Sequence, residues 1–217
     1  VVMKNFVITL LDNEKSVQAA NRCISSGLRF NFEIEQFKAF TPHTCNEFIK
    51  KQKINVIGFS NNIYSREDNA KACFSSHFAL WQLCAETNQE ITIFEHDAFI
   101  IDIIPSTPYQ GCISFGKPSY GKYNIPKTLG RNTLTSKRYF PGAHAYRIKP
   151  NAARIFIDAA RLEAKPTDIF LNTQMFPFLE EFYPWPVETR ETFTTIQKKQ
   201  GCLAKHMYNE DYIIEDI

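Results

Sequence analysis

The first forty residues of the chain alternate between a strand pattern and a helix pattern. Asn5–Leu11 is a short apolar run with β-branched residues, which indicates a buried strand. Glu14–Ser25 is compatible with a helix that we expect Gly27 to end, and Phe30–Phe40 alternates in part, as a second strand would. A strand–helix–strand opening is typical of a layered α/β fold, so we predict that class.

The same alternation continues downstream without an internal repeat, a low-complexity tract or a linker. We therefore predict one domain over residues 1–217. The further predicted strands are Ile54–Phe59, Ile91–Phe94, Gly111–Gly116 and Ala143–Ile148. The further predicted helices are Asn69–Thr87, Asn151–Glu163 and Asp168–Phe176, and the predicted long loop is Lys117–Tyr139.

The composition is that of an ordinary globular protein. Of the 217 residues, 44% are hydrophobic and 22% are charged, which excludes a disordered chain, a collagen-like repeat and a coiled coil. The sequence has no run of about 18 apolar residues, so we expect no transmembrane segment. The formal net charge of +2 does not require a polyanionic partner, although a local basic groove is compatible with it.

The cysteines indicate a reducing compartment, and the two ends of the sequence show no export signal or membrane anchor. None of the six cysteines forms a CxxC pair, so we expect no structural zinc site, and four of them lie in apolar segments as small hydrophobic residues. The first residues lack the apolar core of a signal peptide, and the acidic tail 209–216 does not suit a basic membrane anchor. We therefore expect a cytoplasmic protein.

Three polar residues, Glu95, His96 and Asp97, directly follow the predicted strand Ile91–Phe94. In an open α/β sheet the carboxyl ends of the strands face the ligand crevice. Two carboxylates at that edge can bind a hard cation such as Mg²⁺ or Mn²⁺, and phosphate oxygens of a ligand usually complete its coordination. The alternative is that Glu95 and Asp97 only lead the chain into solvent.

The predicted loop Lys117–Tyr139 mixes basic and aromatic residues. Such a segment can be a lid over a diphosphate or a groove for an acceptor, because aromatic rings stack on sugars and on bases. The alternative is a solvated loop whose charges keep it soluble. The basic residues are Lys117, Lys122, Lys127, Arg131, Lys137 and Arg138, and the aromatic residues are Tyr120, Tyr123, Tyr139 and Phe140.

Four further segments form a pattern. The predicted helix carries Ser-His, then an aliphatic residue and Trp, within Ala72–Trp81, and Ile93–Ala98 supplies a strand and the acidic triplet. Gly142–Ile148 and Pro166–Asp168 lie downstream. Together with the first strand, these segments resemble glycosyltransferase family 25, typified by bacterial lipooligosaccharide and collagen galactosyltransferases, over roughly residues 4–175. The family's triplet is Glu-Asp-Asp, and its middle residue is His96 here; imidazole can also bind Mn²⁺.

The resemblance implies a GT-A fold, which is a Rossmann-like α/β/α sandwich with a mostly parallel central sheet. It implies an inverting enzyme that moves galactose or glucose from a UDP-sugar to an acceptor hydroxyl, above all on an oligosaccharide. Residues of about 1–110 would bind the nucleotide sugar and those of about 111–217 the acceptor. Mn²⁺ or Mg²⁺ would stabilise the leaving diphosphate, and a carboxylate or histidine would take the proton of the acceptor hydroxyl.

The resemblance also assigns roles at the acidic strand end. Asp97 is expected to bind the cation and the diphosphate. Glu95 and His96 are secondary candidates for the cation or the donor ribose. His206 would close the metal site from near the C-terminus, and the alternative for it is a surface histidine.

Five other residues are expected to border or support the donor site. Leu10 and Leu11 lie at the exit of the first strand, and Arg66 precedes the Ser-His helix, where it is a candidate phosphate partner. Ser76 and His77 are expected to orient a loop or the acidic strand end. The alternative for His77 is a core histidine on an apolar helix face.

Asp168 is the expected general base. Its alternative is the N-cap of a helix that begins at Ile169, because aspartate is a preferred capping residue. A capping carboxylate has a lowered pKa, so one residue does not easily do both. The residues expected at the acceptor or in a lid are Tyr120, Tyr123, Arg131 and Lys137.

Two other functions stay open on the sequence alone. The same chemistry could act on a hydroxylated base of DNA, and binding would then depend steeply on salt. The histidine in the triplet could instead have disabled the metal site, which would leave a nucleotide-sugar-binding protein.

Overall fold

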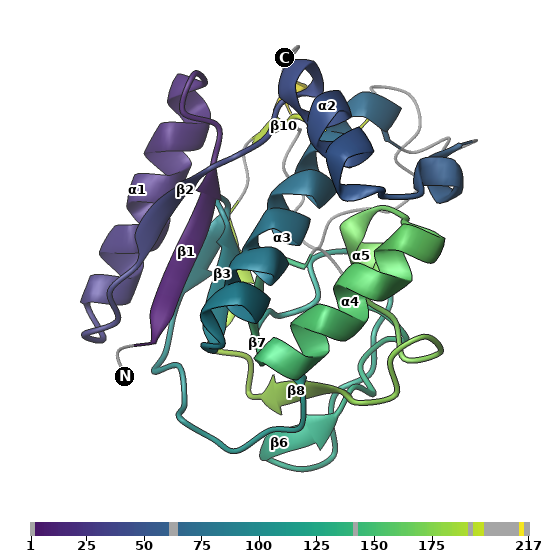
Figure 1. The fold of residues 1–217 in the computed structure, drawn as a ribbon. Helices are drawn as coiled ribbons and strands as arrows, with labels where there is room; N and C mark the ends of the chain where they lie inside the picture. Colours follow the sequence, from purple (N-terminus) through teal and green to yellow (C-terminus); the bar gives the residue numbers. More distant parts are fainter. Residues whose placement is uncertain (1–2, 61–64, 141–142, 191–192, 198–212, 215–217) are drawn as a thin grey trace.

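The computed structural model describes residues 3–60, 65–140, 143–190, 193–197 and 213–214. Seven of the strands form one central sheet in the order β2-β1-β3-β7-β5-β8-β6 (Figure 1). These strands are β1 (Lys4–Thr9), β2 (Glu35–Lys38), β3 (Ile91–Glu95), β5 (Cys112–Ser114), β6 (Gly130–Thr133), β7 (Ala145–Ile148) and β8 (Leu179–Tyr183).

Five of these seven strands share one direction. β1 is parallel to β2 and β3, and β5 is parallel to β8. β7 lies antiparallel between β3 and β5, and β6 is antiparallel to β8 at the edge of the sheet. The predicted α/β class with a mostly parallel central sheet is therefore confirmed.

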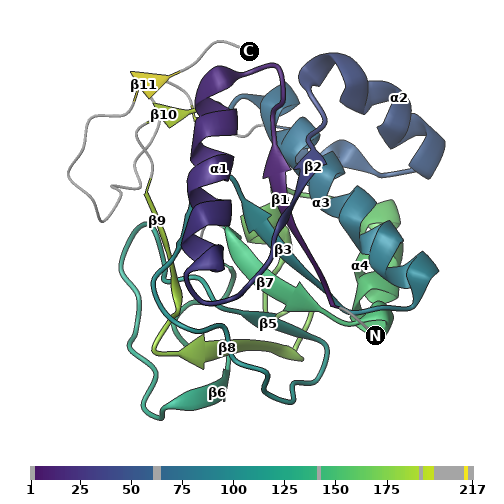
Figure 2. The same ribbon diagram turned by 90° about the vertical axis from the view of Figure 1, so that its left-hand side faces the viewer.

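Helices cover both faces of the sheet (Figure 2). α1 (Glu14–Leu28) lies on one face. The helices on the other face are α2 (Pro42–Gln52), α3 (Glu67–Thr87), α4 (Pro150–Leu162) and the one-turn α5 (Thr167–Phe170). The architecture is the α/β/α sandwich that the sequence predicts.

Alternating residues of β1 contact the two helix layers. Phe6 and Ile8 pack in the core that includes Phe74 of α3, whereas Val7 packs in a second core with Cys23 of α1. Successive side chains of a strand point to opposite faces, so a strand buried on both sides needs an unbroken apolar run. This is why the alternation of apolar runs and helical patterns predicts the layers correctly.

Two short strand pairs lie beside the main sheet. β4 (Ala98–Ile100) is antiparallel to β9 (Val187–Thr189), and β10 (Phe193–Thr194) is parallel to β11 (Ile213–Ile214). β4 follows β3 after a turn, so its pairing with β9 brings residues after 186 next to the acidic strand end. Within the described ranges, no helix combines the length and apolar character that a membrane crossing needs.

One predicted strand is wrong. The segment Ile54–Phe59 forms the 3₁₀ helix η1 (Val56–Phe59). Asn55 begins it, because its side-chain oxygen accepts a hydrogen bond from the Ile57 N–H at 3.2 Å, and its backbone N–H donates to the Ala160 carbonyl of α4 at 3.1 Å. Ile54 and Phe59 are buried in the core, whereas Ile57 is 67% exposed, and the segment pairs with no strand of the described chain.

Gly27 does not end α1, which continues to Leu28. Its role is close packing, because a Cβ at this position would lie 2.7 Å from the Phe32 carbonyl oxygen. The predicted helix Asp168–Phe176 is also shorter than expected, since it ends with α5. The Asn172 side chain donates hydrogen bonds to the backbone carbonyls of Ile169 and Phe170, so these carbonyls have a partner without a further helical turn.

The predicted loop Lys117–Tyr139 contains the edge strand β6. Its residues, Gly-Arg-Asn-Thr, have little intrinsic preference for a strand. The strand exists through its antiparallel pairing with β8, which lies about 50 residues downstream in the sequence. A local pattern cannot reveal such a pairing.

Five cysteines lie in the described residues, and all five are free thiols. Cys73 is partly exposed, and Cys202 lies outside the described residues. The buried ones, which behave as the predicted small hydrophobic residues, are Cys23, Cys45, Cys84 and Cys112.

Candidate functional site

A pocket lies at the carboxyl ends of β1 and β3, where the sequence predicts the donor site. It encloses about 670 Å³ of empty space, part of which is open solvent. The predicted site residues that line it are Leu10, Ser76, Glu95, His96 and Asp97. The other lining residues are Ile8, Ala39, Phe40, Pro42, Asn69, Ala72, Cys73 and residues 193–196.

The acidic strand end holds carboxylates close together and largely out of bulk water. Glu95 is the last residue of β3, and Asp97, which is 4% exposed, lies in the turn to β4. Burial raises the pKa of Glu95 well above its usual value, and the negative charges of Asp97 and Asp168 raise it further. Three carboxylates therefore repel one another near this end of the sheet, and a cation would relieve that repulsion.

His96 connects α1, the end of β1 and β10 at the pocket wall. Its Nδ1 lies 2.9 Å from the Ser16 hydroxyl, which accepts a hydrogen bond from the Leu10 N–H at 2.9 Å. Its ring stacks on Phe193 with the centroids 5.3 Å apart. Burial lowers the pKa of His96, and the charge of Asp97 offsets this only in part, so the neutral ring dominates at pH 7.

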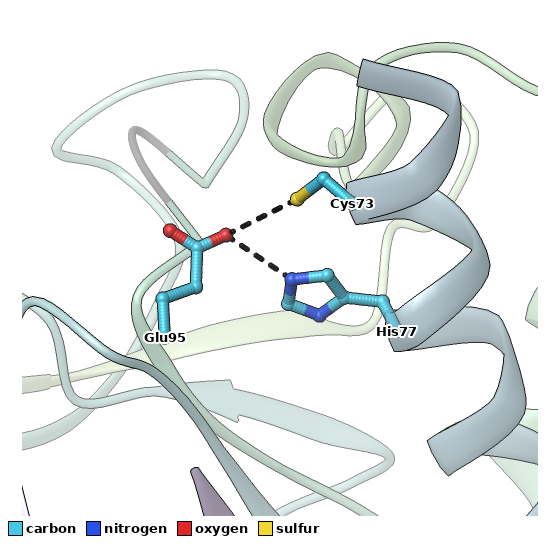
Figure 3. A group of neighbouring side chains, drawn as sticks. All are labelled: Cys73, His77 and Glu95. Atoms are coloured by element: carbon cyan, nitrogen blue, oxygen red, sulfur yellow. Dashed lines mark hydrogen bonds and ion pairs between the residues drawn. The ribbon is translucent and has the colours of Figure 1, made fainter. Parts of the chain in front are cut away.

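His77 and Cys73 of α3 both point toward Glu95 (Figure 3). The His77 Nε2 lies 3.1 Å from Glu95 Oε1, and the Cys73 Sγ lies 3.8 Å from the same oxygen. Burial lowers the pKa of His77 to about 3, so this histidine is neutral. His77 thus contacts the acidic strand end that the sequence analysis expects it to orient.

The ligand atoms of Cys73, His77 and Glu95 lie within 4.8 Å of one another, close enough for one metal ion. A thiolate, an imidazole and one carboxylate suit zinc better than Mn²⁺ or Mg²⁺, which prefer oxygen ligands. For a hard cation, the Asp97 carboxylate offers the more suitable chemistry.

Ser76 and Asn69 of α3 hold two walls of the pocket. The Ser76 hydroxyl donates to the Ala72 carbonyl at 3.0 Å and accepts a hydrogen bond from the Phe40 N–H at 2.9 Å. The Asn69 amide donates to the Thr195 carbonyl. One helix therefore ties the segment after β2 and the segment 193–196 to the same pocket.

Asp168 lies within α5, and its negative charge raises the pKa of Glu95. The N-cap of α5 is Pro166, so the capping alternative for Asp168 is wrong. The Asp168 carboxylate accepts hydrogen bonds from the Tyr120 hydroxyl and, at 3.0 Å, from the Ile169 N–H. Burial raises the pKa of Asp168, and the Tyr120 hydrogen bond is the largest of the effects that lower it in part.

Tyr120, Tyr139 and Lys137 form an aromatic and basic group beside Asp168, here called the tyrosine–lysine group. The two tyrosine rings stack with their centroids 6.4 Å apart. The Lys137 Nζ lies 5.0 Å from the Tyr120 centroid and 5.4 Å from that of Tyr139, and it donates to the Tyr120 carbonyl at 2.7 Å. Two of the four residues expected at the acceptor or in a lid thus lie beside the expected base.

The other two lie elsewhere. Tyr123 packs edge-on against Trp185 with ring centroids 5.6 Å apart, and Arg131 of β6 forms an ion pair with Glu180 of β8 at 3.4 Å. Neither lines the pocket. Both contacts stabilise the edge of the sheet around β6 and β8.

Two further predicted residues are not part of the pocket lining, and a third is not described. Leu11 is 45% exposed in the turn after β1. Arg66 is the N-cap of α3, and its N–H donates to the Ile196 carbonyl at 2.7 Å. His206 lies outside the described residues.

Phe40, Asn69 and the segment 193–196 line the pocket although the sequence did not single them out. For Asn69 a signal existed, because it precedes Cys73 by four residues and Ser76 by seven, which places all three on one helix face. The segment 193–196 carries no comparable signal. It reaches the pocket through the pairing of β9 with β4 and through the hydrogen bonds that Asn69 and Arg66 donate to its backbone carbonyls.

The model of glycosyltransferase family 25, an LPS biosynthesis protein family, matches residues 2–104. Among solved structures, the chain is similar to a mutant of Drosophila β-1,4-galactosyltransferase 7 in complex with manganese, UDP-Gal and xylobiose. The two sequences are 10% identical, and the match covers 79% of this chain and 68% of the other, with a TM-score of 0.36. A similarity this loose supports no conclusion about the chemistry. No curated protein matches the chain. Residues 2–104 make up just under half of the chain and include β1, the Ser-His helix and the acidic strand end, so this part of the chain is similar to glycosyltransferase family 25 and the match supports a glycosyltransferase.

Proposed function

We propose that the chain transfers galactose or glucose from a UDP-sugar to a hydroxyl of an oligosaccharide, with inversion at the anomeric carbon. One observation carries the proposal: Glu95, His96 and Asp97 converge with an apolar wall in one pocket at the carboxyl ends of β1 and β3. Ligands of open α/β sheets bind at such an edge. The family match over residues 2–104 supplies the class of reaction.

The lining of the pocket suits a nucleotide. Ile8, Leu10, Phe40 and Pro42 provide an apolar wall for a flat base. Glu95 can accept hydrogen bonds from the ribose hydroxyls. A UDP-sugar would use both features, because it combines an apolar ring face with hydroxyls and a charged diphosphate.

The carboxylates also suit a hard divalent cation. Burial raises the pKa of Glu95 most, repulsion by Asp97 and Asp168 raises it further, and a cation would offset this repulsion. We propose that Asp97 would hold Mn²⁺ or Mg²⁺ together with oxygens of the diphosphate. When bound, the ion would supply positive charge to the leaving diphosphate.

Asp168 is the proposed general base. Burial raises the pKa of its carboxyl, which makes the carboxylate a better proton acceptor, and the Tyr120 hydroxyl holds one of its oxygens. The acceptor hydroxyl would lose its proton to Asp168 while its oxygen bonds to the anomeric carbon. The bond from that carbon to the diphosphate breaks at the same time.

The tyrosine–lysine group is the proposed platform for the acceptor. Its stacked rings lie beside Asp168, and aromatic faces pack well against the C–H faces of sugars. All three residues fall within residues 111–217, which we propose as the acceptor half. Residues 1–110 supply most of the donor pocket, with residues 193–196 as the contribution of the other half.

A DNA acceptor has no comparable support among the described residues. Arg131 is paired with Glu180, and Lys137 is engaged with Tyr120 and Asp168. These two residues of the basic middle segment therefore already have partners within the protein, which compete with a phosphate backbone for their charge.

The test is release of UDP from UDP-galactose and UDP-glucose in the presence of oligosaccharide acceptors, with and without Mn²⁺. We expect turnover with one donor, and we expect Asp97→Asn to lose it by about 100-fold or more while circular dichroism stays unchanged. The matched control is Asp102→Asn, an exposed acid on the neighbouring loop, which should keep its turnover. Full turnover in Asp97→Asn would refute the assignment, and tight donor binding without any turnover would favour a disabled enzyme.

A further inference from the structure

A chain of polar side chains runs through the core to the pocket. The Trp81 Nε1 of α3 lies 2.8 Å from the hydroxyl of Tyr146 on β7, and the same hydroxyl lies 2.8 Å from His77 Nδ1. The other ring nitrogen, His77 Nε2, lies 3.1 Å from Glu95 Oε1. Trp81, Tyr146 and His77 are each 0% exposed, whereas Glu95 reaches the pocket.

The hydrogen bonds in this chain have one direction. An indole N–H can only donate, so the Tyr146 oxygen accepts from Trp81. The single hydroxyl proton of Tyr146 then goes to His77 Nδ1, its other partner within the described residues. His77 therefore carries its proton on Nε2 and donates it to Glu95 Oε1.

This direction makes the two oxygens of Glu95 different. Oε1 accepts from His77, and the Cys73 thiol points at the same oxygen from 3.8 Å (Figure 3). Within the described part of the chain, no hydrogen bond reaches Oε2. The core thus holds one oxygen of a pocket residue and leaves the other for a ligand.

We propose that Tyr146 and His77 are positioning residues that fix Glu95 through Oε1 and leave Oε2 for a hydroxyl of the ligand, and that Cys73, His77 and Glu95 do not form a metal site. The identity of the ligand, a UDP-sugar, rests on the proposed function. The direction of the hydrogen bonds does not rest on it.

A metal ion on Cys73, His77 and Glu95 would reverse the chain. The ion needs an unprotonated Nε2, so the ring proton would have to move to Nδ1. Tyr146 would then face two donors, Trp81 Nε1–H and His77 Nδ1–H. The hydroxyl proton of Tyr146 would then have no acceptor among the described residues. Because Tyr146 is 0% exposed, water could not replace that acceptor, and an unsatisfied buried donor destabilises the folded state.

The first experiment determines the tautomer of His77 by NMR on protein labelled with ¹⁵N-histidine. We expect a protonated Nε2 and an unprotonated Nδ1 between pH 6 and 9, with the signal assigned by its loss in His77→Gln. A protonated Nδ1, or a doubly protonated ring, would overturn the proposal. This readout needs no turnover and no ligand.

The second experiment measures the affinity for UDP-galactose and UDP-glucose by calorimetry in three variants. His77→Gln keeps an acceptor for Tyr146 and a donor for Glu95, so it should bind the donor about tenfold more tightly than His77→Leu, which keeps neither. Tyr146→Phe frees the ring of His77 and should lie between them. Equal affinities in His77→Gln and His77→Leu would overturn the positioning role.

Trp81→Phe separates positioning from stability. It removes bulk and one N–H donor from the core but leaves Tyr146 able to donate to His77. It should lower the melting temperature at least as much as Tyr146→Phe and yet bind the donor more tightly than Tyr146→Phe. The reverse order of affinities would show that Tyr146 acts only through stability.

The third experiment titrates the protein with Co²⁺ and records the sulfur-to-cobalt absorption of a metal-bound thiolate. We expect no such band. A band that is lost in Cys73→Ser would overturn the proposal. If wild-type protein binds neither UDP-sugar, the proposed function fails, and the tautomer and cobalt readouts still decide the direction of the hydrogen bonds.

Discussion

Glu95 and Asp168 lie near the same end of the sheet, and burial is the main cause of the raised pKa of each. They differ in the residues that hold them. Glu95 accepts from a neutral, fully buried histidine on α3. Asp168 accepts from a phenol and from a backbone N–H on a one-turn helix, with Lys137 close by.

The difference shows how surroundings give two carboxylates two functions. The side-chain partners of Glu95 both come from the long helix α3, and Glu95 itself ends the central strand β3, so its position is rigid; its negative neighbours disfavour ionisation. The hydrogen bonds and the positive charge at Asp168 favour ionisation and so keep it able to accept a proton. We therefore propose Glu95 for binding and Asp168 for proton transfer.

The largest expected effect follows from that division. Asp168→Asn removes the proposed base, so kcat should fall by about 10²- to 10⁴-fold. The affinity for the UDP-sugar should change little, because Asp168 does not line the donor pocket. Steady-state kinetics and calorimetry on the same preparation give both quantities. A loss confined to donor affinity would reverse the roles of the two carboxylates.

Glu95→Gln should show the opposite pattern. The amide oxygen can still accept from His77, but the NH₂ group replaces the acceptor Oε2. We expect donor affinity to fall about tenfold, with a smaller effect on kcat. The same two measurements apply, and Glu86→Gln, an exposed substitution on α3, is the control. A larger loss in kcat than in affinity would contradict a binding role.

Tyr120→Phe tests the proton-acceptor role through pH. The Tyr120 hydrogen bond lowers the pKa of Asp168, so its removal raises that pKa. The acidic limb of the kcat profile should then move to higher pH, while the alkaline limb stays in place. Lys137→Gln should move the acidic limb in the same direction but by less, since Lys137 lowers the pKa of Asp168 less than the Tyr120 hydrogen bond does. An unmoved acidic limb would mean that another group sets it.

The smallest effect concerns stability. The pKa of Glu95 is raised in the folded state, so the folded protein binds this proton more tightly than the unfolded chain does. Its contribution is therefore fully present below the unfolded pKa and is lost as pH rises through the folded value. Glu95→Gln should gain melting temperature relative to wild type as pH rises from 4 to 8. Parallel melting curves would show that Glu95 titrates as it does in the unfolded chain.

Local sequence patterns predict much of this fold because strand and helix periodicity is a local property. The apolar run in β1 and the end of the apolar run of β3 after Phe94 are visible in the sequence and agree with the strands of the structure. The segment Ile54–Phe59 shows the limit, because an apolar run also fits the buried side of a 3₁₀ helix. The strand β6 was missed because pairing with β8, and not its own residues, makes it a strand.

The α/β layers and the acidic residues at the end of β3 could be predicted before the structure was known, since both follow from residue order along one segment. Three features became apparent only from the folded chain: the hydrogen bond from His77 to Glu95, the hydrogen bond from Tyr120 to Asp168, and the contribution of residues 193–196 to the pocket. The physical reason is that these contacts join segments from 18 to more than 100 residues apart. Their geometry depends on how strands pair and helices pack, which no short stretch of sequence specifies.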